Sequence, residues 1–322
     1  MQVWGIGEVL WDIFPDKERF GGAALNFCAN LQRLGDTASL LSAVGKDARG
    51  QLALQRMAEL HLSTRYVRVV DDRPTGVAVV GQTSEGEPSF VIPRPAAFDS
   101  LSLDNGAIHD AQQSGVDWIY FGTLLQTASD VERFTSDLIH LLPQSRCFYD
   151  MNLRADQWNL ALVQRLSGLA SVLKLNEAEA KTLYTQTHPQ TADFTVEKFC
   201  RVWSATYDIQ VICVTLGGAG CCVYEQDAIY VVPGFPVTVC DTVGSGDAFA
   251  AGFLHGYHRG WPIADTARFA NALGALVASR AGATPDWSIQ ECLKFLENVP
   301  SGTGLGNLHD SGYPLPWAWE QQ

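Results

Sequence analysis

The sequence predicts an α/β protein with a mostly parallel, doubly wound sheet. Short β-type runs alternate with longer stretches of helical apolar spacing, and several of the β-type runs end in Gly or Asn. Alternating strands and helices form parallel βαβ units, which bind ligands beyond the carboxyl ends of their strands. The chain has 322 residues and is 47% hydrophobic, which is enough for one large domain or two smaller ones.

The predicted elements follow one another in a regular order. The β-type runs lie at residues 2–7, 38–45, 117–122, 147–152, 171–176 and 211–217. The stretches that we expect to be helical lie at 21–35, 50–60, 130–142, 156–170, 176–185 and 248–257. One part breaks the alternation, because residues 75–94 hold two β-type runs joined by the turn SEGEPS and predict a β-hairpin. Together with VLWDIF at 9–14, this hairpin is expected to form a small second sheet.

Charge and cysteine usage narrow the class of protein. A formal net charge of -13 argues against nucleic acid or an anionic membrane surface as the main partner, since both need a basic face. The sequence has no run of about 18 apolar residues and no signal-like N-terminus, so we expect no membrane span and no secretion signal. The cysteines form no C-x-x-C pair and mostly lie in apolar runs, which indicates buried thiols in a reducing compartment. We expect a cytoplasmic protein.

The segment DTVGSGDAFAAGF at 241–253 indicates an anion-binding site. If a helix begins at Ala248, the backbone N–H groups of the residues before it point outward with the positive end of the helix dipole. These residues are Gly244, Ser245, Gly246 and Asp247. The alternative is that Asp247 simply caps a core helix. A carboxylate at a helix N-terminus is stabilised in its charged form, so we expect Asp247 to be a weak base.

This segment resembles the second signature of the ribokinase/PfkB carbohydrate kinase family, D-T-x-G-A-G-D, with Ser245 in place of the commoner alanine. Other segments resemble elements of the family in the expected order: GEVLWD (7–12) and GGAALNFCANLQRLG (21–35) on the sugar side, VGKD (44–47), LNEAEA (175–180) for N-x-x-E, and VTLGGAG (214–220) for the nucleotide loop. The likeness runs from about Met1 to Leu296. It implies a ribokinase-like fold and ATP-dependent phosphorylation of a sugar hydroxyl.

The resemblance also implies roles for single residues. Asp247 would take the proton from the attacking hydroxyl, while the N–H groups of Gly244, Ser245 and Gly246 hold the γ-phosphoryl group. Glu179 would hold Mg²⁺ through water, and Asp241 would be one ligand of a monovalent cation such as K⁺. The residues expected to contact ATP are Lys174, Asn176, Thr215, Gly217, Gly220, Asn271, Gly282 and Ala283.

We expect the sugar to contact side chains from several segments. Asp12 and Asn26 suit hydroxyl recognition, because a carboxylate accepts hydrogen bonds from two adjacent hydroxyls and an amide both donates and accepts them. Arg154, in DMNLR, resembles the D-x-N-x-R segment of fructokinases and 2-keto-3-deoxygluconate kinases. The full expected set is Asp12, Gly21, Gly22, Asn26, Arg94 and Arg154. These features favour fructose, while 2-keto-3-deoxygluconate, ribose, a nucleoside or a non-catalytic sugar-binding role on the same fold remain alternatives.

The expected organisation is a single kinase domain over residues 1–300, with an irregular tail at 301–322. Within the domain, residues of about 8–20 and 74–98 would form a discontinuous β lid that covers the sugar and excludes water. In the family such lids often pair across a dimer, which implies a homodimer through the lid. An unpaired strand edge there would otherwise be a liability.

Overall fold

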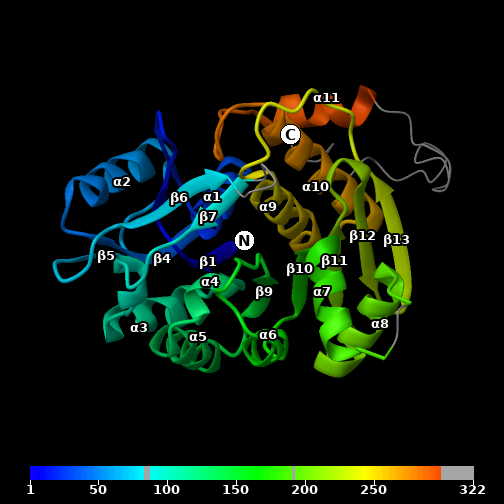
Figure 1. Ribbon diagram of the computed structural model, residues 1–322, viewed down its shortest axis with the longest axis horizontal. Coiled ribbons are helices and arrows are strands. Elements are labelled where there is room, and N and C mark those ends of the chain that lie inside the picture. Colours follow the sequence, from blue (N-terminus) through cyan, green and yellow to red (C-terminus); the bar gives the residue numbers. More distant parts are fainter. Residues whose placement is uncertain (83–87, 191–192, 299–322) are drawn as a thin grey trace.

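A nine-stranded sheet lies at the centre of the computed structural model, which describes residues 1–82, 88–190 and 193–298 (Figure 1). Its strands are β1 (Gln2–Ile6), β4 (Thr37–Gly45), β5 (Val67–Val70), β8 (Trp118–Gly122), β9 (Arg146–Asp150), β10 (Val172–Asn176), β11 (Val211–Thr215), β12 (Gly220–Glu225) and β13 (Ala228–Pro233). They are ordered β13-β12-β11-β10-β9-β8-β1-β4-β5. The strands from β11 to β5 are parallel, whereas β12 and β13 pair antiparallel at one edge. The predicted fold class is confirmed.

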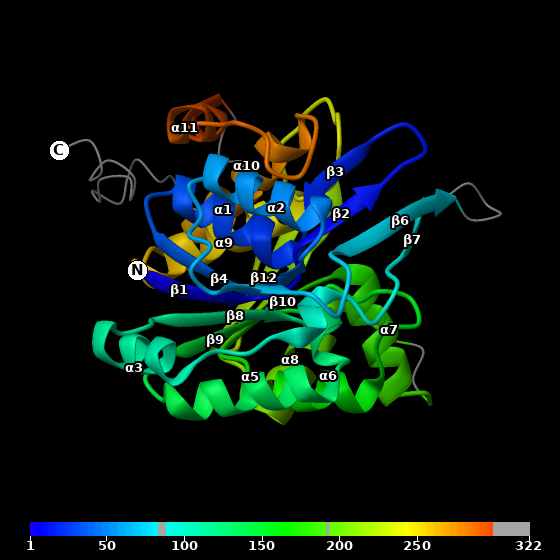
Figure 2. The ribbon, with the colours of Figure 1, turned by 90° about the vertical axis from the view of Figure 1, so that its left-hand side faces the viewer.

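Helices cover both faces of the sheet, as Figure 2 shows with the sheet seen from its edge. On one face lie α1 (Ala23–Arg33), α2 (Ala48–Glu59), α9 (Ser245–His258), α10 (Ile263–Ala278) and, further out, α11 (Ile289–Asn298). On the other face lie α3 (Asn105–Ser114), α5 (Ser129–Leu141), α6 (Leu160–Ser167), α7 (Glu177–Thr187) and α8 (Val196–Tyr207). The short helix α4 (Thr123–Gln126) follows β8 directly. Because helices cover both faces, the central strands are almost continuously apolar.

Helix α9 differs from the others because it is buried over most of its length. Its residues from Asp247 to Gly256 are all buried, and it packs against both α1 and α10. Small side chains permit this packing: a Cβ on Gly252 would lie 3.2 Å from the Cα of Ala270. The small-residue run after Asp247 therefore lets a helix pass through the core and bring its N-terminus to the carboxyl ends of the strands.

A separate small sheet projects from one end of the main sheet (Figure 2). It contains β2 (Leu10–Ile13), β3 (Glu18–Gly21), β6 (Gly76–Gln82) and β7 (Pro88–Val91), in the order β3-β2-β6-β7. The predicted pairing of the hairpin strands and the position of β2 beside them are confirmed. The strand β3 was not expected. Most of the hairpin turn, at 83–87, and the predicted tail lie outside the described residues.

Further elements that the sequence analysis did not predict include β12 and β13. They form a hairpin whose turn residues Gln226 and Asp227 both have positive φ, the backbone that a two-residue hairpin turn requires. Neither is glycine, so the usual sequence signal of such a turn is missing. All eight cysteines are free thiols, and all except Cys240 are buried. Among the described residues, no helix combines the length and apolar character needed to cross a membrane.

Candidate active site

The N-terminus of α9 begins three residues earlier than expected. Gly244 is the N-cap, with a φ of 81°, and the helix starts at Ser245, so Asp247 lies inside the first turn. Helix geometry leaves the N–H groups of Gly246 and Asp247 without an acceptor within the helix. The Ser245 N–H donates to the Thr242 carbonyl at 3.3 Å. The N–H groups of Gly246 and Asp247 are therefore available as donors at this helix end.

Asp247 is buried, and its carboxylate accepts a hydrogen bond from the Asn26 amide Nδ2 at 2.8 Å. Burial, together with the nearby charge of Asp150, raises the pKa of Asp247 to about 7. The Lys174 ammonium and the Asn26 amide offset only part of this effect. The sequence predicted that the helix N-terminus would stabilise the charged form of Asp247, whereas burial shifts its pKa in the opposite direction.

A buried ion pair lies beneath the same helix end. The Lys174 ammonium donates to both carboxylate oxygens of Asp150, at 3.0 and 3.2 Å, and Asp150 also accepts a hydrogen bond from the Tyr120 hydroxyl at 3.1 Å. Burial opposes the charge of Lys174, but the carboxylates of Asp150, Asp247 and Glu179 hold its pKa above the usual value. A Cβ on Gly246 would lie 3.1 Å from the Lys174 Nζ atom. Lys174 therefore places positive charge directly behind the helix N-terminus.

On the sugar side, two predicted residues converge on one space. A Cβ on Gly21 would lie 3.6 Å from Oδ2 of Asp12 and 3.9 Å from Oδ1 of Asn26. The Asn26 Oδ1 atom is buried and has no hydrogen-bond partner in the described part of the chain. Burial raises the pKa of Asp12 to about 6, although Arg154 and Arg19 lower it. This space therefore presents an unused amide acceptor and a carboxylate side by side.

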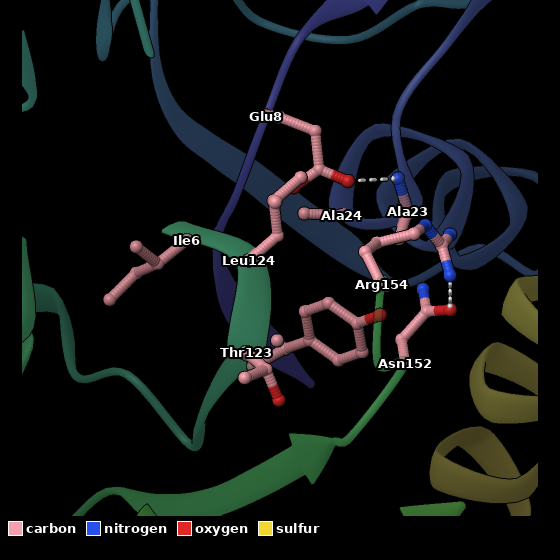
Figure 3. A pocket seen from close by; sticks show the side chains of 10 residues that line it. Ile6, Glu8, Ala23, Ala24, Thr123, Leu124, Asn152 and Arg154 are labelled. Atoms are coloured by element: carbon pink, nitrogen blue, oxygen red, sulfur yellow. Dashed lines mark hydrogen bonds between the residues drawn. The ribbon is translucent and has the colours of Figure 1, made fainter. Parts of the chain in front are cut away.

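Beside this space lies a narrow pocket lined by Glu8 and Arg154 (Figure 3). Glu8 Oε1 accepts the Ala23 N–H at 2.9 Å and so caps α1, while Arg154 donates to the Asn152 side chain at 2.7 Å. The enclosed volume of about 10 Å³ holds one water rather than a sugar ring. Gly22 serves the packing, since a Cβ there would lie 2.2 Å from the Glu8 carbonyl oxygen.

A second pocket, of about 200 Å³, opens on the other side of the α9 N-terminus. The predicted residues that line it are Thr215, Gly217, Gly220, Ser245, Gly246 and Asn271. Gly220 has a φ of 106°, and a Cβ on it would lie 2.1 Å from the Val232 carbonyl oxygen. The Asn271 amide is used structurally, because it donates to the carbonyls of Val232 and Pro233 at 3.1 and 3.2 Å.

Glu179 and Asn176 form a capping box at the start of α7. One Glu179 oxygen accepts the Asn176 N–H at 2.8 Å and the other accepts the Leu153 N–H at 2.7 Å. Burial raises the pKa of Glu179, and the Asn176 N–H and the Lys174 ammonium offset part of the rise. Each oxygen keeps acceptor capacity for a water, so the carboxylate fits a hydrated Mg²⁺ held through water.

Four further predicted residues make contacts within the protein. The Arg94 guanidinium donates to Asp99, to the Leu124 carbonyl and to Thr127. Asp241 is bonded to the guanidinium of Arg19 and to the N–H of Gly282. Gly282 and Ala283 lie behind the anion-binding loop, since a Cβ on Gly244 would meet the Ala283 carbonyl oxygen at 2.3 Å.

Sequence reasoning assigned no role to four residues of this site, Glu8, Arg19, Tyr120 and Asp150. Glu8 and Asp150 stand in GEVLWD and DMNLR, the two segments that supplied Asp12 and Arg154. The signal that could have identified Glu8 and Asp150 was therefore that each is a carboxylate in the same short motif as a predicted sugar-binding residue. No sequence pattern marks Arg19 or Tyr120.

Comparison with known proteins identifies relatives along most of this chain. The model of the pfkB family carbohydrate kinases matches residues 14–290. A putative sugar kinase from Pyrococcus horikoshii is 26% identical over 312 residues, covering 91% of this chain and 94% of its own length. A fructokinase from Klebsiella pneumoniae is 27% identical over 301 residues, covering 88% and 94%.

A solved structure shares the fold. The putative ribokinase II of E. coli, in complex with ATP and Mg²⁺, superposes with a TM-score of 0.78 over 92% of this chain and 99% of its own, at 20% identity. The family match covers the glycine-lined pocket, the helix α9 and three of the four strands of the small sheet. The chain belongs to the pfkB family of carbohydrate kinases.

Proposed function

We propose that the protein transfers the γ-phosphoryl group of ATP to a hydroxyl of fructose, with Asp247 as the base. The observation that carries this proposal is the position of Asp247. It lies in the first turn of α9 between two spaces, and it is bonded to Asn26 at 2.8 Å on the sugar side. Gly246, its neighbour, lines the other pocket.

The residues around Asp247 suit general-base catalysis. Asn26 holds one carboxylate oxygen, which leaves the other free to accept the proton of a sugar hydroxyl. A pKa of about 7 in the ligand-free protein makes Asp247 a stronger base than an ordinary aspartate at neutral pH. The N–H groups of Gly246 and Asp247, with the Lys174 ammonium behind them, would stabilise the charge on the transferring phosphoryl group.

ATP and Mg²⁺ complete the proposed site. The glycine-lined pocket beyond Gly246 would take the nucleotide, because glycines let the phosphates approach the backbone. Glu179 would hold hydrated Mg²⁺, which brings charge neutralisation and orientation to the phosphates when it is bound. The structural neighbour in complex with ATP and Mg²⁺ supports this choice of cofactors.

The electrostatics of the sugar side favour a neutral acceptor. The Arg154 guanidinium lowers the pKa of both Asp12 and Asp247, so it already lies in the field of two carboxylates, and it shares its pocket with Glu8. A sugar acid such as 2-keto-3-deoxygluconate would bring a further negative charge into this set, at a Coulomb cost. The fructokinase among the relatives supports the same choice. The narrow Glu8–Arg154 pocket would take one exocyclic group of the sugar.

The outer face of the small sheet supports a homodimer. Alternation along β2 and β3 turns Asp12 and Arg19 to one face and residues such as Ile13 to the other. Val79 and Val91 are cross-strand partners, and they are 44% and 62% exposed. Pairing of the small sheets of two copies would cover these valines. Within each copy, the small sheet would act as the lid over the sugar, and the whole chain would form a single kinase domain. Sedimentation velocity should give a dimer that Val91→Lys dissociates.

The test of the proposed activity is a panel of acceptors assayed for ATP- and Mg²⁺-dependent phosphate transfer. The panel contains fructose, ribose, adenosine and 2-keto-3-deoxygluconate, each with and without Mg²⁺. Fructose should give the highest kcat/KM. Faster use of another acceptor rejects fructose and retains the kinase, whereas sugar binding without transfer to any acceptor supports the non-catalytic alternative.

A further inference from the structure

The Asp241 carboxylate is already surrounded by hydrogen-bond donors. Its Oδ2 atom accepts from the Arg19 guanidinium and, at 3.2 Å, from the Gly282 N–H, while Oδ1 accepts from the Val243 N–H at 3.1 Å. The side chains of Arg19 and Asp241 are only 26% and 11% exposed. A monovalent cation at this carboxylate would lie beside a guanidinium of the same charge. The residues present therefore do not fit the cation site that the family resemblance implies.

We propose that Arg19 takes the place of this cation, so that the enzyme needs no K⁺. The proposal rests on the proposed function, in which a phosphoryl group binds at the N-terminus of α9. Asp241 lies in the loop that leads into this helix, and its Oδ1 atom bonds to the loop backbone at Val243. An unpaired carboxylate here would repel the phosphoryl group, and the Arg19 charge cancels that repulsion.

Arg19 also links this loop to the sugar side. It lies on β3 directly opposite Asp12 on β2, so both side chains emerge on the same face of the small sheet. The Phe14 ring, in the turn between these strands, lies 5.2 Å from the guanidinium carbon and holds the side chain in place. A guanidinium has five N–H donors in a rigid fork, so one arginine can interact with both carboxylates. Arg19 is thus a positioning residue, and any movement of the small sheet would change the pairing of Asp241.

The first test compares rates in KCl and in choline chloride at equal ionic strength. The proteins are the wild type, Arg19→Gln, Arg19→Lys and the matched control Arg49→Gln. The control breaks the ion pair between Arg49 on α2 and Glu18, which is the neighbour of Arg19 on β3. Wild type, Arg19→Lys and the control should show equal kcat in both salts. Arg19→Gln should lose on the order of tenfold in kcat in choline and recover it saturably with K⁺. K⁺ dependence of the wild type, or a loss that K⁺ does not restore, overturns the proposal.

The second test needs no catalysis, and its failure is therefore distinct from a failure of the proposed function. Thermal unfolding without substrates is measured in the same two salts. A cation that binds only the folded state raises Tm by mass action. K⁺ should raise the Tm of Arg19→Gln relative to choline and leave that of the wild type unchanged. An equal Tm of Arg19→Gln in both salts contradicts the proposal. A higher Tm of the wild type in KCl than in choline chloride also contradicts it, and this second outcome can be measured even if Arg19→Gln does not fold.

Discussion

The two sides of Asp247 are built from different groups. On the nucleotide side six glycines line the wall among apolar and small residues, and Gly220 is needed because any Cβ would collide with a neighbouring carbonyl oxygen. On the sugar side the wall is formed by charged and amide side chains, such as Asp12 on β2, Asn26 on α1 and Arg154 in the loop after β9. A backbone site depends on the absence of side chains and tolerates little change. A side-chain site can be altered one group at a time, which suits a family whose members differ in acceptor.

The largest effect is expected at the residue between the two sides. Asp247→Asn keeps the shape and a bond to Asn26 but removes the proton acceptor. Turnover should fall about 100-fold or more, with little change in ATP affinity. Steady-state kinetics and calorimetric ATP binding check this result, with Asp137→Asn on the exposed face of α5 as the control. Near-normal turnover in Asp247→Asn eliminates Asp247 as the base.

A smaller but still large loss of turnover is expected for a change on the nucleotide side, at Gly246. Gly246→Val places a Cβ 3.1 Å from the Lys174 Nζ atom and forces the ammonium away from the helix N-terminus. We expect a loss of about 10- to 100-fold in kcat while sugar binding persists. Gly246→Ala should give an intermediate value, and circular dichroism checks the fold. Full activity in a folded Gly246→Val protein means that the phosphoryl group does not bind there.

The difference between the two sides also explains what the sequence could predict. The glycine-rich segments around Thr215 and Gly246 could be assigned to the nucleotide side because both resemble motifs of the family. Their shared pocket then agrees with the rule that ligands bind beyond the carboxyl ends of parallel strands. The start of α9 was misplaced because Gly and Ser have low helix propensity. Tertiary packing overrides that propensity, since Gly244 adopts a positive φ against Ala283 and the helix is buried beyond it.

Side-chain partners across long sequence separations were not predictable. Asn26 meets Asp247, and Arg19 meets Asp241, across more than 200 residues, and each contact depends on how the small sheet and α1 sit against α9. Periodicity gives no such distances. The contacts of Arg94 were missed although Asp99 is only five residues away, because no sequence pattern indicates that this aspartate holds the guanidinium. The pKa of Asp247 was missed because burial at the helix N-terminus is a tertiary property.

The sugar side should respond in a graded way. Asp12→Ala should lower kcat/KM for fructose by about tenfold or more, since a hydroxyl loses a charged partner, and Arg154→Ala should lower it less. Measuring kcat/KM for fructose and 2-keto-3-deoxygluconate in both variants and the wild type tests the order. Should the wild type prefer the acid and lose that preference in Arg154→Ala, Arg154 binds a carboxylate and the fructose assignment is wrong.

The smallest expected effect is on stability, and it separates burial of Asp247 from its catalytic role. The folded protein raises the pKa of Asp247 from 3.8 to about 7, so it binds a proton more tightly than the unfolded chain does. The stabilisation from this proton is complete below the unfolded pKa and is lost as the pH rises through 7. An asparagine at position 247 does not titrate, so its contribution to stability does not change with pH. Ligand-free Asp247→Asn should therefore gain Tm relative to the wild type between pH 5.5 and 8, by an amount equivalent to a few kcal/mol at most. Asp12 titrates in both proteins, so its contribution cancels in the difference. A Tm difference that does not change with pH over this range contradicts a raised pKa, and the argument that Asp247 is a base active near neutral pH then fails with it.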